Sequence, residues 1–260
     1  MKIIDQLNRI ISIKETPKRI VSLVPSQTEL LFDLGLETTI VGITKFCIHP
    51  KHLLKSKTIV GGTKQIKLDK IKALQPDIIL CNKEENTEAI VKACEQIAVV
   101  HVSDIMTIQD CIDMIQQYGE IFNTPKKALK ISETIQNNVN DFNLFIKNKH
   151  PLKVAYYIWK NPWMVAGQNT FINYLLRLNN FDNVYAHLGR YPEIDEKGLE
   201  DADVVLLSSE PYPFKKEHIE ELQTRYTNAN ILLVDGEMFS WYGSRLIKAF
   251  AYFKTLHQNL

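Results

Sequence analysis

One long helical pattern divides this chain into two parts of similar length. Apolar residues recur over 128–146 in steps of three or four, the period of an α-helix with one buried stripe. Thr124 suits the N-cap, Pro125 suits the first helical position, and Pro151 marks the far limit. Such a helix is about 35 Å long at ~1.5 Å per residue, longer than a crossover between neighbouring strands requires. We expect it to join two lobes; a long surface helix within one domain is the alternative. The stripe consists of Ala128, Ile131, Ile135, Val139, Phe142 and Ile146.

Strand-like and helix-like segments alternate on both sides of this helix. Before it, the pattern predicts strands at 20–24, 39–43, 77–80 and 99–102 and helices at 27–34, 85–97 and 107–118, with a further short helix ending over 71–74. After it, strands are expected at 154–159, 204–207 and 231–234 and helices at 170–178, 216–222 and 244–256. Such alternation is typical of parallel sheets covered by helices. The predicted fold is therefore α/β, with two Rossmann-like lobes of parallel sheet (1–123 and 151–260) joined by a single long backbone helix (124–150).

A weak internal repeat supports two related lobes. Residues 77–84 and 203–210 share the form Asp-[Ile/Val]-[Ile/Val]-Leu-x-x-x-Glu, an acidic start followed by a buried strand and a polar loop. Chance similarity of two short parallel strands is the alternative.

Composition narrows the classes of partner. The 31 basic and 30 acidic side chains nearly cancel, which argues against nucleic acid, since that binding needs a concentrated basic face. No stretch approaches the ~20 apolar residues of a membrane span. The four cysteines lack a CxxC spacing and are expected to be free thiols, with a Cys81–Cys94 disulfide as the alternative. Residues 1–13 show no signal-peptide pattern. We therefore expect a periplasmic protein if a signal peptide has been removed, and a cytoplasmic one if Met1 is the native start.

The candidate functional residues follow the strands, because ligands of open parallel sheets bind beyond the carboxyl ends of the strands. Aromatic rings beside Lys and Arg suit a flat or ring-shaped ligand with anionic groups. Simple core packing of the tryptophans at the strand ends is the alternative. The first half contributes Ser26, Lys45, Phe46, Thr63 and Lys83, and the second half contributes Trp159, Trp163, Arg190, Tyr191, Tyr212, Phe239, Trp241 and Arg245.

Enzyme motifs are mostly absent from the sequence. It contains neither a Gly-x-Ser-x-Gly elbow nor a Gly-x4-Gly-Lys phosphate loop. His49 and His52 are interpreted as part of a surface turn rather than a metal site. We therefore expect no enzyme, no catalytic residues, no metal and no cofactor. An enzyme would need an acid–base pair such as Glu210 with Lys83.

Several stretches of the sequence match a known family, and the similarity covers nearly the whole chain. On them the sequence resembles the helical-backbone (class III) ABC-transporter solute-binding proteins, in particular the vitamin B12 (cobalamin)-binding protein family. The Glu-Leu and Leu-x-Pro-Asp stretches are fairly specific for this superfamily. The matching residues are 19–32, Gly35, Gly42, 60–62, 68–80, Asn161-Pro162, Gly167, Asn183-Val184, Tyr191-Pro192 and 239–245.

The resemblance implies the solute-binding component of an ABC-type importer, a transport protein of the periplasmic binding type. It implies a monomer with limited closure that holds a corrinoid-, haem- or siderophore-like ligand, cobalamin or another metal chelate, in an aromatic interlobe cleft. Phe46 and Tyr191 match aromatic cleft positions, whereas Thr63 and Asn82 stand near positions where the family has tryptophans. A cytoplasmic ligand sensor or carrier on the same scaffold, or less readily an enzyme, is the alternative.

The family also docks on its transporter permease through one exposed glutamate in each lobe. Glu88 matches the first docking position. Lys197 stands at the second, where Glu196 is the nearest preceding acid and is taken as the docking residue. We expect Trp163→Ala or Tyr191→Ala to weaken ligand binding without affecting folding.

Overall fold

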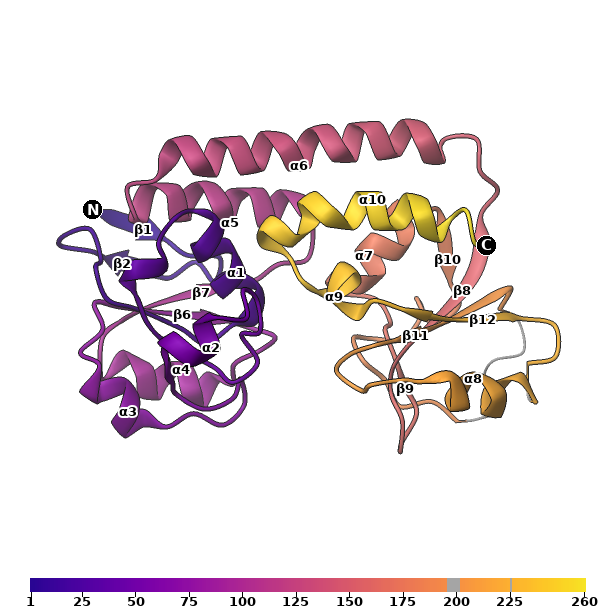
Figure 1. The fold of residues 1–260 in the computed structure, drawn as a ribbon, viewed down its shortest axis with the longest axis horizontal. Coiled ribbons are helices and arrows are strands. Elements are labelled where there is room, and N and C mark those ends of the chain that lie inside the picture. Colours follow the sequence, from indigo (N-terminus) through magenta and orange to yellow (C-terminus); the bar gives the residue numbers. More distant parts are fainter. Residues whose placement is uncertain (196–201, 225) are drawn as a thin grey trace. The chain divides into compact units, whose positions relative to one another are not determined.

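The computed structural model describes residues 1–195, 202–224 and 226–260, which divide into two compact units. The N-terminal unit consists of residues 1–135 together with 242–245, and the C-terminal unit of residues 136–241 and 246–260. Helix α6 (Pro125–Ile146) begins in the first unit and ends in the second (Figure 1). Each unit is α/β with a parallel sheet, as the alternation of the sequence predicts.

The N-terminal sheet has the strand order β5-β4-β3-β6-β7, and each neighbouring pair is parallel. Its residues alternate between the two faces, so that Val21, Ile79 and Val100 pack on one face with residues of the covering helices. Helices α3 and α4 lie on that face and α5 on the other (Figure 1). The strands are β3 (Ile20–Ser22), β4 (Ile40–Ile43), β5 (Thr58–Ile59), β6 (Ile78–Asn82) and β7 (Val99–Ser103); the helices are α1 (Pro25–Asp33), α2 (Leu53–Ser56), α3 (Leu68–Ala73), α4 (Glu88–Glu95) and α5 (Ile108–Ile121), with a 3-10 turn at Glu37–Thr39.

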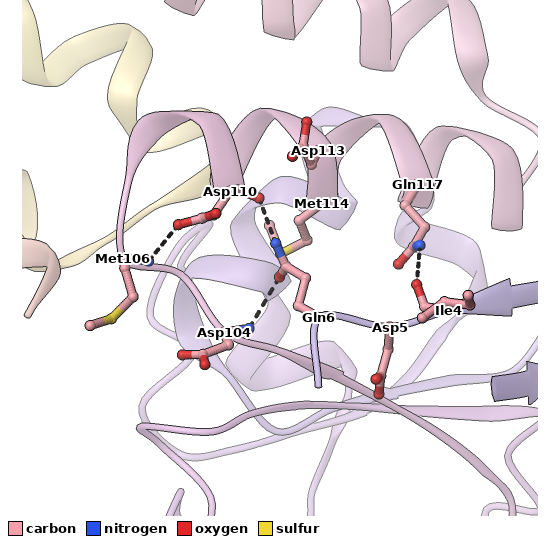
Figure 2. A pocket seen from close by; sticks show the side chains of 9 residues that line it. All are labelled: Ile4, Asp5, Gln6, Asp104, Met106, Asp110, Asp113, Met114 and Gln117. Carbon is pink, nitrogen blue, oxygen red and sulfur yellow. Dashed lines mark hydrogen bonds between the residues drawn. The ribbon is translucent and has the colours of Figure 1, made fainter. Parts of the chain in front are cut away.

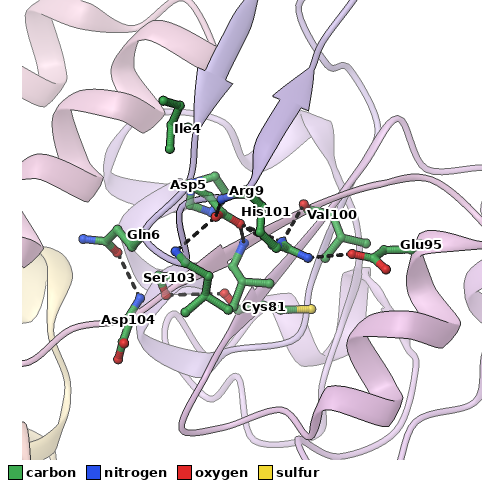
Figure 3. A network of polar contacts seen from close by, with 12 residues as sticks. Ile4, Asp5, Gln6, Arg9, Cys81, Glu95, Val100, His101, Ser103 and Asp104 are labelled. Atoms are coloured by element: carbon green, nitrogen blue, oxygen red, sulfur yellow. Dashed lines mark hydrogen bonds and ion pairs between the residues drawn. The ribbon is translucent and has the colours of Figure 1, made fainter.

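A β-hairpin that the sequence did not predict precedes this sheet. Strands β1 (Lys2–Ile4) and β2 (Ile10–Ser12) pair antiparallel across a turn that begins with Asp5. The Asp5 carboxylate accepts hydrogen bonds from the backbone N–H groups of Leu7, Arg9 and Val102, at 3.0, 3.0 and 3.1 Å. The Arg9 guanidinium pairs with both Asp5 and Glu95 (Figure 3). One buried carboxylate therefore fixes the hairpin turn against β7.

The C-terminal sheet has the strand order β10-β8-β11-β12, again parallel, with β9 antiparallel to β8. Helix α8 lies on one face and α7 and α10 on the other (Figure 1). Tyr157 and Leu222 pack on the α8 face, while Tyr156 packs on Phe239 and belongs to the opposite face. The elements are β8 (Leu152–Trp159), β9 (Met164–Val165), β10 (Phe181–Asn183), β11 (Val204–Ser208), β12 (Asn230–Val234), α7 (Phe171–Leu178), α8 (Lys216–Gln223), α9 (Gly236–Ser240) and α10 (Leu246–Leu256), with a 3-10 turn at Gly243–Arg245.

The internal repeat has a structural cause. Asp77 begins the approach to β6, and its carboxylate accepts hydrogen bonds from the N–H groups of Lys18 and Arg19 at 2.7 and 2.9 Å, just before β3. Asp203 stands before β11, and its carboxylate accepts from the N–H of Lys153 at 2.8 Å, at the start of β8. In both units the aspartate ties the start of one central strand to the start of its neighbour. The strand pairs β3–β6 and β8–β11 are thus equivalent.

Helix α6 has the predicted stripe and one different detail at its start. All six stripe residues are buried, which confirms the predicted face. Pro125 is the first helical residue, as predicted. The expected hydroxyl cap is wrong: Thr124 Oγ1 is buried with no hydrogen-bond partner among the described residues. Its backbone carbonyl accepts from the N–H groups of Lys127 and Ala128 instead, both at 3.1 Å.

The four cysteines are free and buried, as predicted from their spacing. The alternative, a Cys81–Cys94 disulfide, is not formed. Burial raises the pKa of the Cys111 thiol to about 12 and also raises the pKa of Cys47. These thiols therefore behave as small apolar core residues.

A partly buried histidine follows the end of α10. The His257 ring lies against Phe181, Phe142 and Phe145, with centroids 4.9, 6.2 and 6.0 Å away. Burial, aided by the charge of Lys149, lowers the pKa of His257 to about 4. The folded protein therefore favours the neutral imidazole, whereas the unfolded chain takes up a proton near pH 6.5.

This difference predicts an acid-sensitive stability. The contribution is fully present above about pH 6.5 and is lost as the pH falls through the window from about 6.5 to 4, because the unfolded chain then binds the proton first. Relative to His257→Gln, the wild type should lose about 2 kcal/mol of unfolding free energy across this window in urea denaturation. The exposed His150→Gln is the control. Parallel pH profiles for wild type and His257→Gln would contradict the assignment.

Candidate functional site

Each sheet has a topological switch point, which is where open α/β proteins bind ligands. In the N-terminal sheet the switch point lies between β3 and β6, because the chain continues from β3 to β4 on one side and from β6 to β7 on the other. In the C-terminal sheet the corresponding neighbours are β8 and β11. The residues that follow these strands are therefore the first candidates for a site in each unit.

The loop after β6 is held by side-chain hydrogen bonds. The Asn82 side chain accepts hydrogen bonds from the N–H groups of Glu84 and Glu85 at 2.8 and 3.2 Å. Asn86 accepts from the Asn82 N–H at 2.9 Å and donates to the Thr63 carbonyl at 2.9 Å. Both asparagines are buried. The loop and the predicted site residue Thr63 are thus held together by side-chain amides. Asparagine suits both positions because its side chain can bond nearby backbone groups.

The predicted residues Lys83, Ser26 and Thr63 differ in exposure. Lys83 is exposed, and its ammonium pairs with Asp104 at 2.6 Å. Ser26 is buried in the first turn of α1. Beside Thr63, burial raises the pKa of the partly buried Glu85 carboxyl, while the charge of Lys64 and the Thr63 hydroxyl lower it. The site edge in this unit thus carries charges of both signs.

Lys45 and Phe46 form an exposed aromatic and basic pair after β4. Phe46 is 48% exposed, and the Lys45 ammonium lies 4.9 Å from the centre of its ring. A Cβ on Gly62 would come within 3.1 Å of the Phe46 ring, so glycine lets the ring lie close to that backbone. A cation so close to the face of an aromatic ring is attracted to it, so the pair forms one exposed aromatic and basic feature.

Residues 242–245 complete the N-terminal unit through a buried polar network. The Gln27 amide donates to Ser103 Oγ at 2.7 Å and to Tyr242 Oη at 3.0 Å. Tyr118 Oη donates to the Gln27 carbonyl oxygen at 2.9 Å. Burial raises the pKa of both tyrosines, so they remain neutral. The network ties this returning segment to α1, to the end of β7 and to α5.

Arg245, a predicted ligand contact, lies in a buried ion pair. Its Nε donates to Glu29 Oε2 at 2.9 Å, and both side chains are buried. The N–H of the nearby Gly243 donates to Cys111 Sγ at 3.0 Å. Arg245 therefore stabilises the returning segment within the N-terminal unit, and its guanidinium is already engaged there.

Trp159 and Tyr212 mark the switch point of the C-terminal sheet. Trp159 ends β8 and is 39% exposed, while Tyr212 follows β11 and is partly exposed. Their ring centroids lie 5.6 Å apart in an edge-on arrangement. The Tyr212 N–H donates to the Ile158 carbonyl at 3.3 Å, which ties the loop after β11 to the end of β8. Two strand ends thus present one aromatic pair.

Trp163 supports this pair from within the core. It is 7% exposed, stacks on Phe214 with centroids 6.0 Å apart, and meets Tyr157 edge-on at 5.4 Å. Lys160 lies over its ring and pairs with Glu221. Trp163 is therefore a core residue, which is the alternative that the sequence left open.

Phe239 and Trp241 are also buried in the structure. Phe239 packs on Tyr156 and Phe253, with centroids 5.1 and 4.8 Å away. The Trp241 indole donates to Glu210 Oε1 at 2.8 Å, and Ser240 donates to the same oxygen at 2.7 Å. Both rings hold α9 against the sheet rather than facing solvent.

Arg190 and Tyr191 lie on a segment held along the β9 region. Gly167 N–H donates to the Arg190 carbonyl at 2.7 Å, and Arg190 N–H donates to the Gln168 carbonyl at 2.8 Å. A Cβ on Gly167 would lie 2.4 Å from the Leu188 carbonyl, so this close approach requires glycine. Arg190 is exposed and Tyr191 partly so, and their backbone is fixed.

A separate cavity of about 380 Å³ lies in the N-terminal unit. It is lined by the hairpin turn, the loop before α5 and α5 itself (Figure 2). Its carboxylates are largely engaged: Asp5 accepts from backbone N–H groups and pairs with Arg9, and the Asp110 carboxylate accepts from the N–H groups of Met106 and Thr107. No group of three or more metal-ligating side chains is found in the part of the chain that the structure describes.

The structure describes some of the remaining predicted residues but not all of them. Glu88 is exposed and pairs with Lys92 at 2.7 Å, which lowers the pKa of Glu88. Glu196, the second predicted docking residue, lies outside the described residues. Lys83 and Glu210, named for an enzyme, each bind groups of their own unit.

Sequence reasoning missed Phe214 and His218, which surround Tyr212. The Phe214 and His218 rings lie 4.7 and 5.5 Å from the Tyr212 ring. The alternation Pro-Tyr-Pro-Phe over 211–214 predicts an extended segment with both rings on one side, and it could have identified Phe214. His218 gave no comparable signal, because its role depends on a helix start only three residues away.

Comparisons with known proteins find related sequences. The family described as "Periplasmic binding protein" matches residues 20–231. The uncharacterized ABC transporter substrate-binding lipoprotein YvrC of Bacillus subtilis is 28% identical over 204 residues, which cover 75% of this chain and 64% of that protein. The vitamin B12-binding protein of Vibrio parahaemolyticus is 21% identical over 182 residues, 69% of this chain and 66% of the relative. The aligned region thus spans just under two thirds of these relatives.

Solved structures show the same fold. The periplasmic vitamin B12 binding protein BtuF of Vibrio cholerae superposes with a TM-score of 0.81 at 17% identity, covering 94% of this chain and 98% of that one. A periplasmic heme binding protein from Pseudomonas aeruginosa gives 0.80 at 21% identity, covering 92% of both chains. Within the described residues, no helix is long and apolar enough to cross a membrane.

The different burial of Trp163 and Trp159 predicts losses of stability of different size on truncation. Trp163→Ala should lower the free energy of unfolding by about 3–5 kcal/mol, because it empties a stacked core site. Trp159→Ala removes a partly solvated ring and should cost less than about 1 kcal/mol. Urea denaturation of both variants measures the difference. Equal stability losses would contradict these positions. The burial of Trp163 overturns the expectation that Trp163→Ala leaves folding unaffected.

The buried ion pair predicts a second stability effect. Arg245→Ala leaves the Glu29 carboxylate buried without the guanidinium and should cost about 3–5 kcal/mol of unfolding free energy. Replacing both partners, Glu29→Leu with Arg245→Met, should cost much less, because no charge then remains buried. Lys254→Ala, at an exposed ion pair with Asp141, is the control and should cost under about 1 kcal/mol. A double variant as unstable as Arg245→Ala would overturn this explanation.

Proposed function

Because the chain belongs to the periplasmic binding protein family, we propose that it is the solute-binding component of an ABC-type importer. The observation that carries this proposal is the exposed Trp159–Tyr212 pair at the switch point of the C-terminal sheet. An exposed Lys45–Phe46 pair follows a strand of the N-terminal sheet. Preformed rings beside cations bind a ligand without an ordering cost for long side chains, and they suit recognition rather than bond breaking.

The proposed ligand is a metal chelate of the corrinoid, haem or siderophore class. Large flat ligands gain contact area from exposed rings, and their anionic or polar edges interact with Lys and Arg. Relatives named vitamin B12-binding proteins and neighbours named heme binding proteins support this class. We propose no catalytic step and no resident cofactor; the chelate is cargo.

The exposed residues are proposed to touch the ligand, and the buried ones to support them. The contacting set is Lys45, Phe46, Thr63, Lys83, Trp159, Arg190, Tyr191 and Tyr212. The supporting set is Ser26, Trp163, Phe239, Trp241 and Arg245, which are buried. That one ligand is held in a cleft shared by both units stays a prediction.

The proposed partner is a transporter permease, and the proposed location is outside the cytoplasmic membrane, where the named relatives act as periplasmic proteins or lipoproteins. Glu88 is exposed on α4 and is proposed to contact the permease. Because a docking glutamate need not touch the ligand, Glu88→Ala also provides a surface control for ligand binding.

Titration of the purified protein tests the proposal. Cyanocobalamin, dicyanocobinamide, haemin and ferrichrome are added separately, and quenching of tryptophan fluorescence and the thermal midpoint are followed. At least one chelate should bind with a Kd in the micromolar range or below, and Trp159→Ala should weaken that binding by about tenfold, since a well-packed ring contact contributes roughly 1–2 kcal/mol. Glu88→Ala should leave the Kd unchanged. No quenching and no thermal shift with any of the four would sink the proposal.

A further inference from the structure

The Tyr212 hydroxyl faces a buried histidine. His218 stands in the first turn of α8 and is buried, and its Nε2 lies 3.3 Å from Tyr212 Oη. The two rings meet edge-on at 5.5 Å. The preceding residue, Glu217, carries a carboxylate. Its Oε1 lies 4.0 Å from Nε2, beyond hydrogen-bond distance. Tyr212 is therefore the partner of this nitrogen.

The other ring nitrogen decides the direction of that bond. The backbone N–H of Lys215 donates to His218 Nδ1 at 2.9 Å. A backbone N–H can only donate, so Nδ1 must carry a lone pair. The neutral imidazole then has its proton on Nε2 and donates it to Tyr212 Oη. The hydroxyl accepts from within the protein, and its own proton remains available for an outside acceptor.

The ring that carries this hydroxyl is held from several sides. Trp159 and Phe214 contact it edge-on or tilted, at 5.6 and 4.7 Å, in addition to His218. The N–H of Tyr212 is bonded to Ile158. A partly exposed phenol fixed in this way presents a donor with little orientational freedom to lose, which is the arrangement that gives specificity at a binding site.

We propose that Tyr212 is a specificity-determining residue that donates a hydrogen bond to a carboxylate or amide oxygen at the edge of the ligand, and that His218 is its positioning residue. The inference rests on the proposed function, since it assumes a ligand over the Trp159–Tyr212 pair. It narrows the ligand to chelates with oxygen acceptors on their periphery, and it assigns His218 a role that burial alone would not give.

The variants that test it separate the two nitrogens of His218. Asparagine places an acceptor near the position of Nδ1, so His218→Asn keeps the bond from Lys215 and loses the donor to Tyr212. Glutamine places a donor near Nε2, so His218→Gln keeps the bond to Tyr212 and loses the acceptor. Tyr212→Phe removes the hydroxyl and keeps the ring. Haemin and cyanocobalamin are the probes, and the Kd of each is measured by fluorescence quenching.

For a probe that the wild type binds, Tyr212→Phe should raise the Kd about tenfold, the effect of one lost hydrogen bond. His218→Asn should raise it severalfold, and the Tyr212→Phe/His218→Asn double variant should be no worse than Tyr212→Phe alone, because both act through one bond. His218→Gln should bind within about twofold of wild type. A purely structural role predicts losses that follow the thermal midpoint and are similar in the two His218 variants.

Three results would overturn the inference. The first is a Kd within twofold of wild type for Tyr212→Phe with every probe that binds. The second is loss of an iron charge-transfer band in Tyr212→Phe with haemin, which would make the phenolate a metal ligand instead of a hydrogen-bond donor. The third is a proton on Nδ1 of His218 in the ligand-free protein. The inference requires ¹⁵N chemical shifts that show a protonated Nε2 and an unprotonated Nδ1. This last measurement tests the positioning step even if no probe binds, an outcome that would count against the proposed function itself.

Discussion

The pairing of the two central strands in each sheet is the constraint on which the rest depends. Asp77 and Asp203 fix it, since each carboxylate binds backbone N–H groups at the start of the neighbouring strand. A slip of one residue would turn every side chain of the strand to the other face. The strand ends, and the loops that follow them, are positioned only because this register holds. The two aspartates are far from the carboxyl edges, yet they determine which residues meet there.

A second constraint acts on the N-terminal unit alone. Its sheet and helices come from the first half of the chain, but residues 242–245 return to complete it. Tyr242 joins the Gln27 network and Arg245 pairs with Glu29, so buried polar groups of α1 are satisfied by a segment more than 200 residues away. A fragment that ends after α6 would leave these groups unsatisfied. The N-terminal unit is therefore compact without being independent of the C-terminal sequence.

The sequence predicted the elements better than the exposure of the site residues. Helix α6, the central strands and the cysteines follow from periodicity and spacing, which act locally. The hairpin of β1 and β2 escaped prediction because its short strands are held by long-range contacts of Asp5 with β7. Position after a strand identified Trp159 and Tyr212, but the same rule also selected Trp163, Phe239 and Arg245, which are buried. Whether a ring at a strand end faces solvent depends on residues such as Phe214, whose contacts no local pattern reveals.

The partial exposure of Trp159 and Tyr212 has a physical explanation within their own unit. An aromatic ring left in water loses the burial of part of its apolar surface, which amounts to ~25 cal/mol per Å². Here each ring is partly covered by its neighbours: Trp159 contacts Tyr212 edge-on, and Tyr212 contacts Phe214 and His218. Phe214 in turn stacks on the buried Trp163. The exposed pair is thus the outer end of a stack that begins in the core, so its geometry is set before any ligand arrives. Truncating an inner ring would disorder the outer pair, whereas truncating the outer pair would leave the core intact. For the proposed function, a surface built in this order offers the ligand a preset shape and one directed hydroxyl.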